Sequence, residues 1–122
     1  SRDSASGQAR AEALAKQGLA VSHLTLDIAS QESCERAARI VRDEMGRLDV
    51  LVNNAGVLLD SKRGEWELTE SSAFRVRPEI VRQTFDVNTL GAYRMCQLFL
   101  PIMQKSGHGR VVNVSSGMGQ LE

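Results

Sequence analysis

The positions of apolar residues along the chain predict two helices in its first part, each followed by a glycine. Residues 4–17 are rich in Ala, Gln, Glu and Lys, which favour helix, and Gly18 suits the position after a helix end. Ser30 suits an N-cap, and the helix that it begins is predicted to run to about Met45 and to end at Gly46. One face of that second helix is apolar and consists of Cys34, Ala37, Ala38, Val41 and Met45.

Three short apolar segments predict strands, and a long helix is predicted between the second and the third. The segments are residues 21–26, 48–52 and 110–114. Residues 48–52 are apolar at nearly every position, and residues 110–114 are predicted to form a further strand of the same buried type. Such strands are typical of a parallel sheet that helices cover on both faces. Pro78 suits the first turn of the long helix, which is predicted to reach about Gln104, and Pro101 is expected to kink it or to end it early.

The order of these elements predicts the fold class. Helix, strand, helix, strand, an irregular segment over residues 57–77, helix and strand follow one another in 122 residues, a length that suits one domain. This alternation predicts an α/β fold with a doubly wound parallel sheet and right-handed crossovers.

Charge and composition narrow the classes of partner. The 15 Lys and Arg residues balance the 15 Asp and Glu residues, so net charge indicates neither nucleic acid nor an anionic membrane as a partner. No apolar run is long enough to span a bilayer, and the start does not resemble a signal peptide, although a chain without an initial Met leaves a removed N-terminus open. Cys34 and Cys96 form no CxxC pair, which favours reduced thiols in a cytoplasmic protein. His23 and His108 lack ligand-like spacing, so no metal site is predicted.

Polar and small residues follow the predicted strands, at the place where ligands bind in open parallel sheets. Asp27 follows the first strand, residues 53–56 (NNAG) follow the second, and residues 115–117 (SSG) follow the third. In the second group, amides can bond to backbone groups or a ribose, and Ala55 and Gly56 allow a flat cofactor to approach the backbone closely. The alternative is an ordinary turn after a strand.

Three further residues carry both a structural and a functional interpretation. Asn88 shares a helical stripe with apolar residues, and because an unpaired buried amide costs about 1–3 kcal/mol, it is expected to have a partner: a backbone carbonyl, a water or a catalytic relay. Ser116 suits either a cap or turn, or a donor to a substrate carbonyl. Arg2 is either a solvated residue or one that accommodates a ribose 2′-phosphate. The stripe that contains Asn88 also contains Val81, Phe85, Ala92, Met95 and Phe99.

Together these segments resemble the short-chain dehydrogenase/reductase family, and within it the carbonyl reductases. The resemblance rests on residues 26–28 (LDI), 48–56 (LDVLVNNAG), 86–91 (DVNTLG) and 109–116 (GRVVNVSS), which stand in the family's order. The likeness to carbonyl reductases rests on residues 2–3, 7–8 and 26–28. It implies that residues 1–122 form part of a single NAD(P)-binding domain with a Rossmann-type sheet.

The resemblance also implies roles for residues in cofactor binding. Arg2 would bind the 2′-phosphate, which favours NADP over NAD, Asp27 would contact the adenine amine and Ile28 the adenine ring. Asn54, Ala55 and Gly56 would line the adenosine ribose and the nicotinamide side, while Asn53 would brace the sheet.

In catalysis, the resemblance makes Ser116 the residue that orients the substrate and Asn88 the residue that holds a water in a proton relay. Ser115 is the less favoured neighbour of Ser116. The implied function is that of an NADP(H)-dependent oxidoreductase that interconverts a carbonyl and an alcohol of a small-molecule substrate by hydride transfer.

The chain also departs from the family pattern. No GxxxGxG occurs in it, and Tyr93 is followed by Gln97 where a Tyr-xxx-Lys motif would have lysine. The predicted strands would be the third, fourth and fifth of a Rossmann sheet, so the chain is expected to lack the first strands and the C-terminal part, and these 122 residues alone are expected to be inactive. The alternatives are an inactive fragment or a non-catalytic Rossmann module, such as a cofactor sensor or a partner-binding regulator.

Two segments leave their roles open. The helix over residues 78–104 is the face that many relatives use to dimerise, but packing on the sheet explains its apolar stripe equally well, so a homo-oligomer stays open. The segment over residues 57–77 is longer than the family's usual one, and it could cover the substrate cleft or make an oligomer contact.

Overall fold

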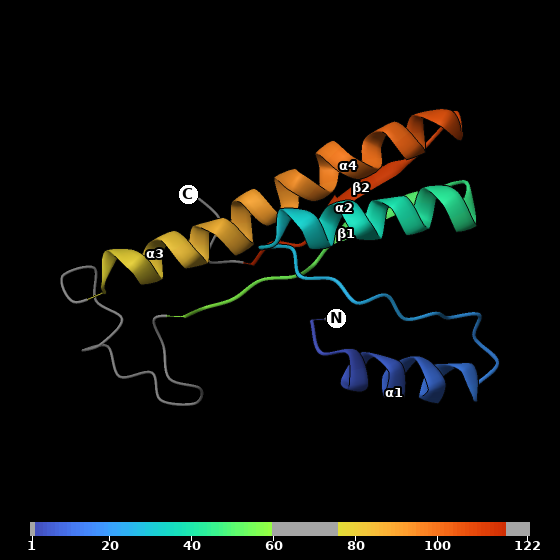
Figure 1. Cartoon of the computed structure of the whole chain (residues 1–122), viewed down its shortest axis with the longest axis horizontal. Helices are drawn as coiled ribbons and strands as arrows, with labels where there is room; N and C mark the ends of the chain where they lie inside the picture. Colours follow the sequence, from blue (N-terminus) through green and yellow to red (C-terminus); the bar gives the residue numbers. More distant parts are fainter. Residues whose placement is uncertain (1, 60–75, 117–122) are drawn as a thin grey trace.

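The fold is a parallel two-stranded sheet with helices packed on one face, seen in a computed structural model that describes residues 2–59 and 76–116 (Figure 1). Most of the irregular segment predicted over residues 57–77 therefore lies outside the described residues. The elements, in chain order, are α1 (Ser4–Ala15), α2 (Gln31–Ile40), the π-helix η1 (Val41–Met45), β1 (Val50–Asn53), α3 (Pro78–Phe85), the π-helix η2 (Asp86–Gly91), α4 (Ala92–Lys105) and β2 (Arg110–Asn113).

The first two helices begin and end at caps that the sequence provides. The Asp3 carboxylate accepts hydrogen bonds from the first backbone amides of α1, and the Ser30 hydroxyl accepts one from the Ser33 amide at the start of α2. Gly18 and Gly46 follow the two helices with φ of 83° and 72°, in the left-handed region that favours glycine. The predicted ends of both helices are therefore confirmed, and the last turn of the second is the π-helix η1.

One long helix runs from Pro78 to Lys105 as α3, η2 and α4 without a break. Pro78 stands in its first turn, as predicted. The expectation that Pro101 ends the helix early is wrong, because α4 continues to Lys105. A proline inside a helix costs about 3 kcal/mol. Around Pro101 this cost is offset by the burial of Phe99, Ile102 and Met103, which hold α4 against the sheet.

Strands β1 and β2 pair in parallel, with Leu51 opposite Val111 and Asn53 opposite Asn113. The strand predicted over residues 21–26 is wrong for the described part of the chain, where these residues form no ladder. A strand exists only through hydrogen bonds to a neighbour, which an apolar sequence cannot supply by itself. Leu24 and Leu26 of this segment still pack against the core.

The core lies between the sheet and the helices α2 and α4. Leu51 of β1 faces this core and is 8% exposed, whereas its neighbours Val50 and Val52 point to the other face and are 49% and 53% exposed. The sequence predicted helices on both faces of the sheet, but among the described residues only one face is covered. The buried cluster consists of Cys34, Ala37, Ala38, Val41, Leu51, Met95, Phe99, Ile102 and Met103.

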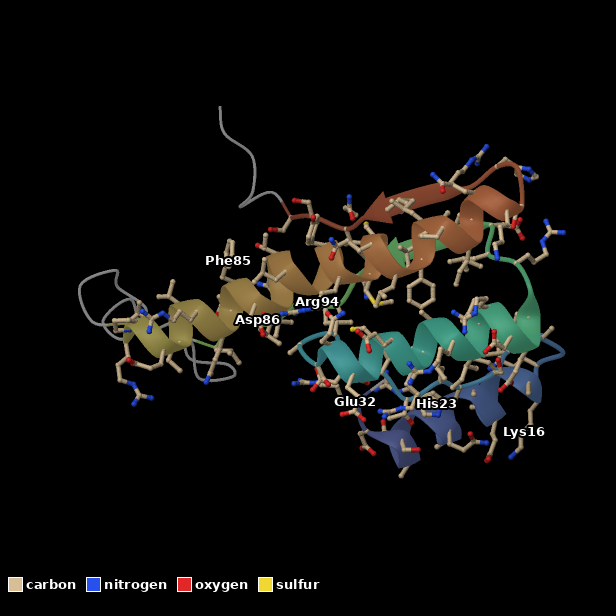
Figure 2. The ribbon with its side chains drawn as sticks, turned by 45° about the horizontal axis from the view of Figure 1, so that its top comes forward. Lys16, His23, Glu32, Phe85, Asp86 and Arg94 are labelled. Carbon is tan, nitrogen blue, oxygen red and sulfur yellow. The ribbon has the colours of Figure 1, made fainter. Side chains whose placement is uncertain are left out.

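Helix α1 lies across the 19–30 segment from the core (Figures 1 and 2). The His23 ring rests on the backbone of α1 at Gly7, where a Cβ would come far inside van der Waals contact with it. Gly7 therefore allows α1 to approach this segment closely, and Arg2, just before α1, comes close to Asp27 and Ile28 at a shared pocket.

Candidate cofactor site

A pocket of about 230 Å³ lies at the carboxyl edge of the sheet. Its walls come from Arg2, two residues before α1, from the end of the 21–28 segment, from the segment after β1, and from η2. The lining residues are Arg2, Leu26, Asp27, Ile28, Ala55, Gly56, Val57 and Val87. A larger hollow of about 360 Å³ runs between α2 and α4, but no residue predicted for the site lines it.

This pocket brings together five of the six residues predicted to bind a cofactor: Arg2, Asp27, Ile28, Ala55 and Gly56. The sixth, Asn54, is exposed beside it without lining it. Residues from three distant parts of the sequence thus meet at one place, at the carboxyl edge of the sheet, where ligands bind in open parallel sheets.

A tight turn after residue 26 shapes one wall of the pocket. Asp27 Oδ1 accepts a hydrogen bond from the Ala29 amide at 3.0 Å, and the Asp27 carbonyl accepts one from the Ser30 amide at 3.1 Å. The Ser33 hydroxyl in turn accepts one from the Asp27 amide at 3.0 Å. Such side-chain bonds to nearby backbone groups are the usual way in which Asp and Ser fix a turn. The turn holds Asp27 and Ile28 at the entrance to α2.

Asn53 joins three elements at the carboxyl end of β1. Its Nδ2 donates to Asn113 Oδ1 on β2 at 2.9 Å and to the Cys96 sulfur on α4 at 3.6 Å. The Val114 amide donates to the Asn53 carbonyl at 3.0 Å and extends the ladder beyond β2. These contacts fix where the backbone leaves the sheet towards Ala55 and Gly56.

Asn88 has a structural partner, the backbone of Val57. Its Oδ1 accepts from the Val57 amide and its Nδ2 donates to the Val57 carbonyl, both at 2.8 Å. A Cβ added to Gly56 would lie 3.5 Å from Asn88 Oδ1. The amide thus fastens the segment that lines the pocket to the long helix, and the implied relay role of Asn88 stays a prediction.

The expected burial of Asn88 is wrong, because this side chain is exposed. Val81 and Phe85 of the same stripe are 51% and 54% exposed, and Phe85 projects away from α2 (Figure 2). The stripe is buried only further along, at Met95 and Phe99, where α4 crosses the sheet. A helical stripe predicts which side chains share a face, and other elements decide how much of that face is covered.

Ser116 follows β2 at the same edge of the sheet as residues 54–56. It is exposed and does not line the pocket. Its predicted substrate-orienting role therefore stays a prediction. Gly117, the last residue of its strand-end group, lies outside the described residues.

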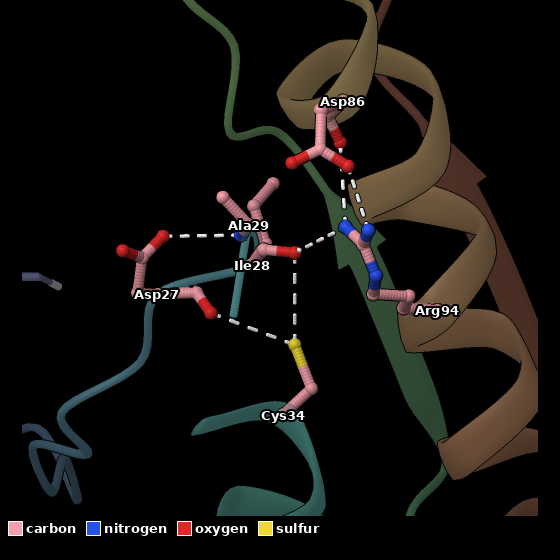
Figure 3. Close-up of polar contacts among 6 residues, drawn as sticks. All are labelled: Asp27, Ile28, Ala29, Cys34, Asp86 and Arg94. Atoms are coloured by element: carbon pink, nitrogen blue, oxygen red, sulfur yellow. Dashed lines mark hydrogen bonds and ion pairs between the residues drawn. The ribbon is translucent and has the colours of Figure 1, made fainter. Parts of the chain in front are cut away.

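A polar network behind the pocket wall was not predicted from the sequence. The Arg94 guanidinium contacts Asp86 Oδ1 at 2.6 Å and donates to the Ile28 carbonyl at 3.1 Å (Figure 3). The Cys34 thiol approaches the Asp27 and Ile28 carbonyls at 3.6 and 3.7 Å. Burial raises the pKa of this thiol, and the positive charge of Arg94 acts in the opposite direction.

One signal in the sequence could have led to this network. Gly91 stands inside a predicted helix, where glycine costs about 1 kcal/mol relative to alanine and usually has a packing or functional reason. The structure supplies the reason, because the Ile28 side chain lies against Gly91, where a Cβ would come 2.7 Å from Ile28 Cδ1.

The described part of the chain shows neither a membrane-spanning helix nor a metal cluster. None of its helices combines the length and the apolar character needed to cross a membrane. Residues 2–59 and 76–116 contain no group of three or more His, Cys, Asp or Glu side chains placed to hold a metal ion.

The chain is similar in sequence to curated proteins that are named as enzymes. The chain is 36% identical over 118 residues to carbonyl reductase [NADPH] 3 of Rattus norvegicus, covering 97% of this chain and 38% of the relative. It is 35% identical over 109 residues to (+)-neomenthol dehydrogenase of Arabidopsis thaliana, covering 80% of this chain and 36% of the relative. The chain thus spans little more than a third of the length of these relatives.

Solved structures give the same fold. A metagenomic short-chain oxidoreductase in complex with NADP superposes with a TM-score of 0.79 at 26% identity, covering 99% of this chain and 50% of the other. The model of the short chain dehydrogenase family matches residues 1–122. With its α/β fold, its parallel sheet and the polar residues at the carboxyl ends of its strands, the chain belongs to the short-chain dehydrogenase family.

Proposed function

We propose that the gene product containing this chain is an NADP(H)-dependent oxidoreductase that interconverts a carbonyl and an alcohol of a small molecule by hydride transfer. The observation that carries the proposal is that Arg2, Asp27, Ile28, Ala55 and Gly56 line one pocket together. The names of the relatives support it, since one is a carbonyl reductase that uses NADPH and another is a neomenthol dehydrogenase.

The residues of the pocket fit the adenosine end of NADP. About 230 Å³ is smaller than the roughly 300–1,000 Å³ of sites that enclose whole ligands, so the pocket suits one end of a dinucleotide. Gly56 leaves the backbone accessible, since among the described residues a Cβ there would meet only Asn88 Oδ1, at 3.5 Å. In the described residues, Asp27 Oδ1 bonds to Ala29 and Oδ2 is left to accept from an adenine amine.

Arg2 supports the preference for NADP. A guanidinium binds phosphate through two parallel hydrogen bonds, and an arginine near this end of the cofactor accommodates the 2′-phosphate. The neighbouring Asp3 carboxylate caps α1 by accepting from the Ala5 and Ser6 amides.

In the proposed reaction, bound NADPH supplies the hydride. The Ser116 hydroxyl donates a hydrogen bond to the substrate carbonyl and orients it. Asn88 keeps the segment after Gly56 in place through Val57, and supports proton return as the resemblance implies. The proton donor that the resemblance implies is a tyrosine further along the chain than Ser116.

Two measurements on the purified gene product test this function. The first is its intact mass against the 13.4 kDa of these 122 residues, which establishes which polypeptide is assayed. The second is titration with NADPH and NADH, followed by NADPH oxidation with a panel of small lipophilic ketones and aldehydes. We expect NADPH to bind at least about tenfold more tightly than NADH, a difference of about 1.4 kcal/mol, and at least one carbonyl to be reduced. Binding without turnover would favour a cofactor sensor instead, and the absence of binding would refute the proposal.

A further inference from the structure

We propose that Arg94, which does not line the pocket, is a positioning residue for the cofactor: it holds the turn at Asp27 and Ile28 against the long helix and so fixes the wall on which the adenine lies. The inference rests on the proposed function and extends it from the residues that touch the cofactor to the one that places them. The sequence assigns no role to Arg94.

The first observation is that Arg94 bridges two elements from behind the pocket. Its Nη1 donates to the Ile28 carbonyl at 3.1 Å, and its Nη2 donates to Asp86 Oδ1 at 2.6 Å (Figure 3). Ile28 lines the pocket, and so does Val87, the residue next to Asp86. The Arg94 side chain is 20% exposed and that of Asp86 37% exposed, so the ion pair is partly shielded from water. One guanidinium therefore sets the distance between two walls of the same pocket.

The second observation is independent of charge. The Ile28 side chain lies on Gly91, where an added Cβ would come 2.7 Å from Cδ1 and 2.9 Å from Cγ1. Gly91 is buried and stands one turn before Arg94 on the same helix. Gly91 thus leaves room for the Ile28 side chain, and Arg94 holds the backbone carbonyl of the same residue.

The bridge requires arginine. A guanidinium presents several donors in a rigid plane and serves two acceptors in different directions, whereas a lysine ammonium is a compact charge on a flexible stem. Arg94→Lys is therefore expected to keep the pair with Asp86 and to lose the bond to Ile28. Arg94→Met removes both contacts and leaves an unbranched apolar side chain at this position of the helix.

The consequence is specific to one half of the cofactor. A loosened turn moves Asp27 and Ile28, which the proposed function assigns to adenine, while Asn53 and its partners keep the sheet edge in place. Binding of adenosine 2′,5′-bisphosphate is therefore expected to weaken as much as binding of NADPH. Binding of the reduced nicotinamide mononucleotide is expected not to change. A general loss of structure would weaken both halves.

The experiment uses the full gene product in three variants, Arg94→Met, Arg94→Lys and the control Arg82→Met, an exposed arginine on the same long helix. Calorimetry with NADPH and with each half of the cofactor gives the dissociation constants. We expect Arg94→Met to weaken NADPH and adenosine 2′,5′-bisphosphate about tenfold, Arg94→Lys to recover only part of this, and Arg82→Met to match wild type.

A second pair of variants keeps every charge. Gly91→Ala places a methyl group against Ile28 and is expected to weaken NADPH several-fold, although alanine favours helix more than glycine does. Adding Ile28→Val removes the closest atom, Cδ1, and is expected to recover part of the affinity. Tight NADPH binding by wild type together with unchanged binding by Arg94→Met and Gly91→Ala would overturn this inference alone. No NADPH binding by wild type would overturn the proposed function as well.

Discussion

At the scale of single residues, the polar side chains around the pocket act first on backbone groups. Asp27 accepts from the Ala29 amide and Asn88 pairs with both backbone groups of Val57, and in this way they shape the segments that form the pocket walls. Asp27 could be found from the sequence because it directly follows an apolar segment. Arg94 could not, because its partner Ile28 stands 66 residues away and only the folded chain brings the two together.

Replacement of Arg2 tests cofactor preference at this scale. Arg2→Ala in the gene product removes the cation proposed to bind the 2′-phosphate, so we expect NADPH affinity to fall about tenfold and NADH affinity to stay the same. Fluorescence titration with both cofactors measures the ratio. Arg10→Ala, an exposed arginine on α1, is the matched control. An equal loss for NADPH and NADH would contradict the assignment of Arg2 to the phosphate.

The two cysteines are expected to differ in reactivity. Cys34 is fully buried, and burial raises the pKa of its thiol, so less of the nucleophilic thiolate is present at pH 8 than for an ordinary cysteine. Cys96 is only half-buried. Titration with a disulfide reagent under native conditions should therefore label Cys96 well before Cys34, and both after unfolding. A Cys96→Ser variant that still reacts rapidly would show that Cys34 is accessible.

At the scale of elements, the helices could be predicted and one strand could not. Helix ends are local, since Ser30, Gly18 and Gly46 cap or terminate a helix through their own backbone and side-chain chemistry. A strand depends on a partner, and residues 21–26 have an apolar sequence without a ladder in the described part of the chain. Tertiary contacts allow α4 to continue through Pro101, because the buried residues around it keep the chain helical.

Asn88 is a test at the element scale because it joins the long helix to the segment after β1. Asn88→Ala removes two hydrogen bonds of 2.8 Å to Val57, each worth about 0.5–1.5 kcal/mol in an ordinary context, so we expect a loss of about 1–2 kcal/mol in the free energy of unfolding. Urea denaturation of the gene product measures it. Gln83→Ala, an exposed position on α3, serves as the control and should stay within about 0.5 kcal/mol of wild type. A stability equal to that of wild type would mean that Asn88 holds nothing in place.

At the scale of the whole molecule, the sheet has one covered and one uncovered face among the described residues. Val52 and Val112 lie side by side in the parallel register and are 53% and 44% exposed, while Leu51 on the opposite face is buried. The sequence predicted strands that are covered on both faces, because strands with apolar residues on both faces are typical of sheets with two covered faces. A contiguous exposed apolar face of this kind is a surface for association.

This face predicts how the 122-residue chain behaves when it is produced alone. We expect it to bind an apolar fluorescent dye such as anilinonaphthalene sulfonate and to self-associate in light scattering, because the exposed valines form a continuous surface. Val52→Thr with Val112→Thr should reduce both signals and keep the strands, since threonine is β-branched and suits a strand. Leu51→Thr changes the buried face instead and is expected to unfold the chain, because it places a hydroxyl in the core. If the double threonine variant bound as much dye as wild type, the apolar surface responsible would have to lie elsewhere than on this face of the sheet.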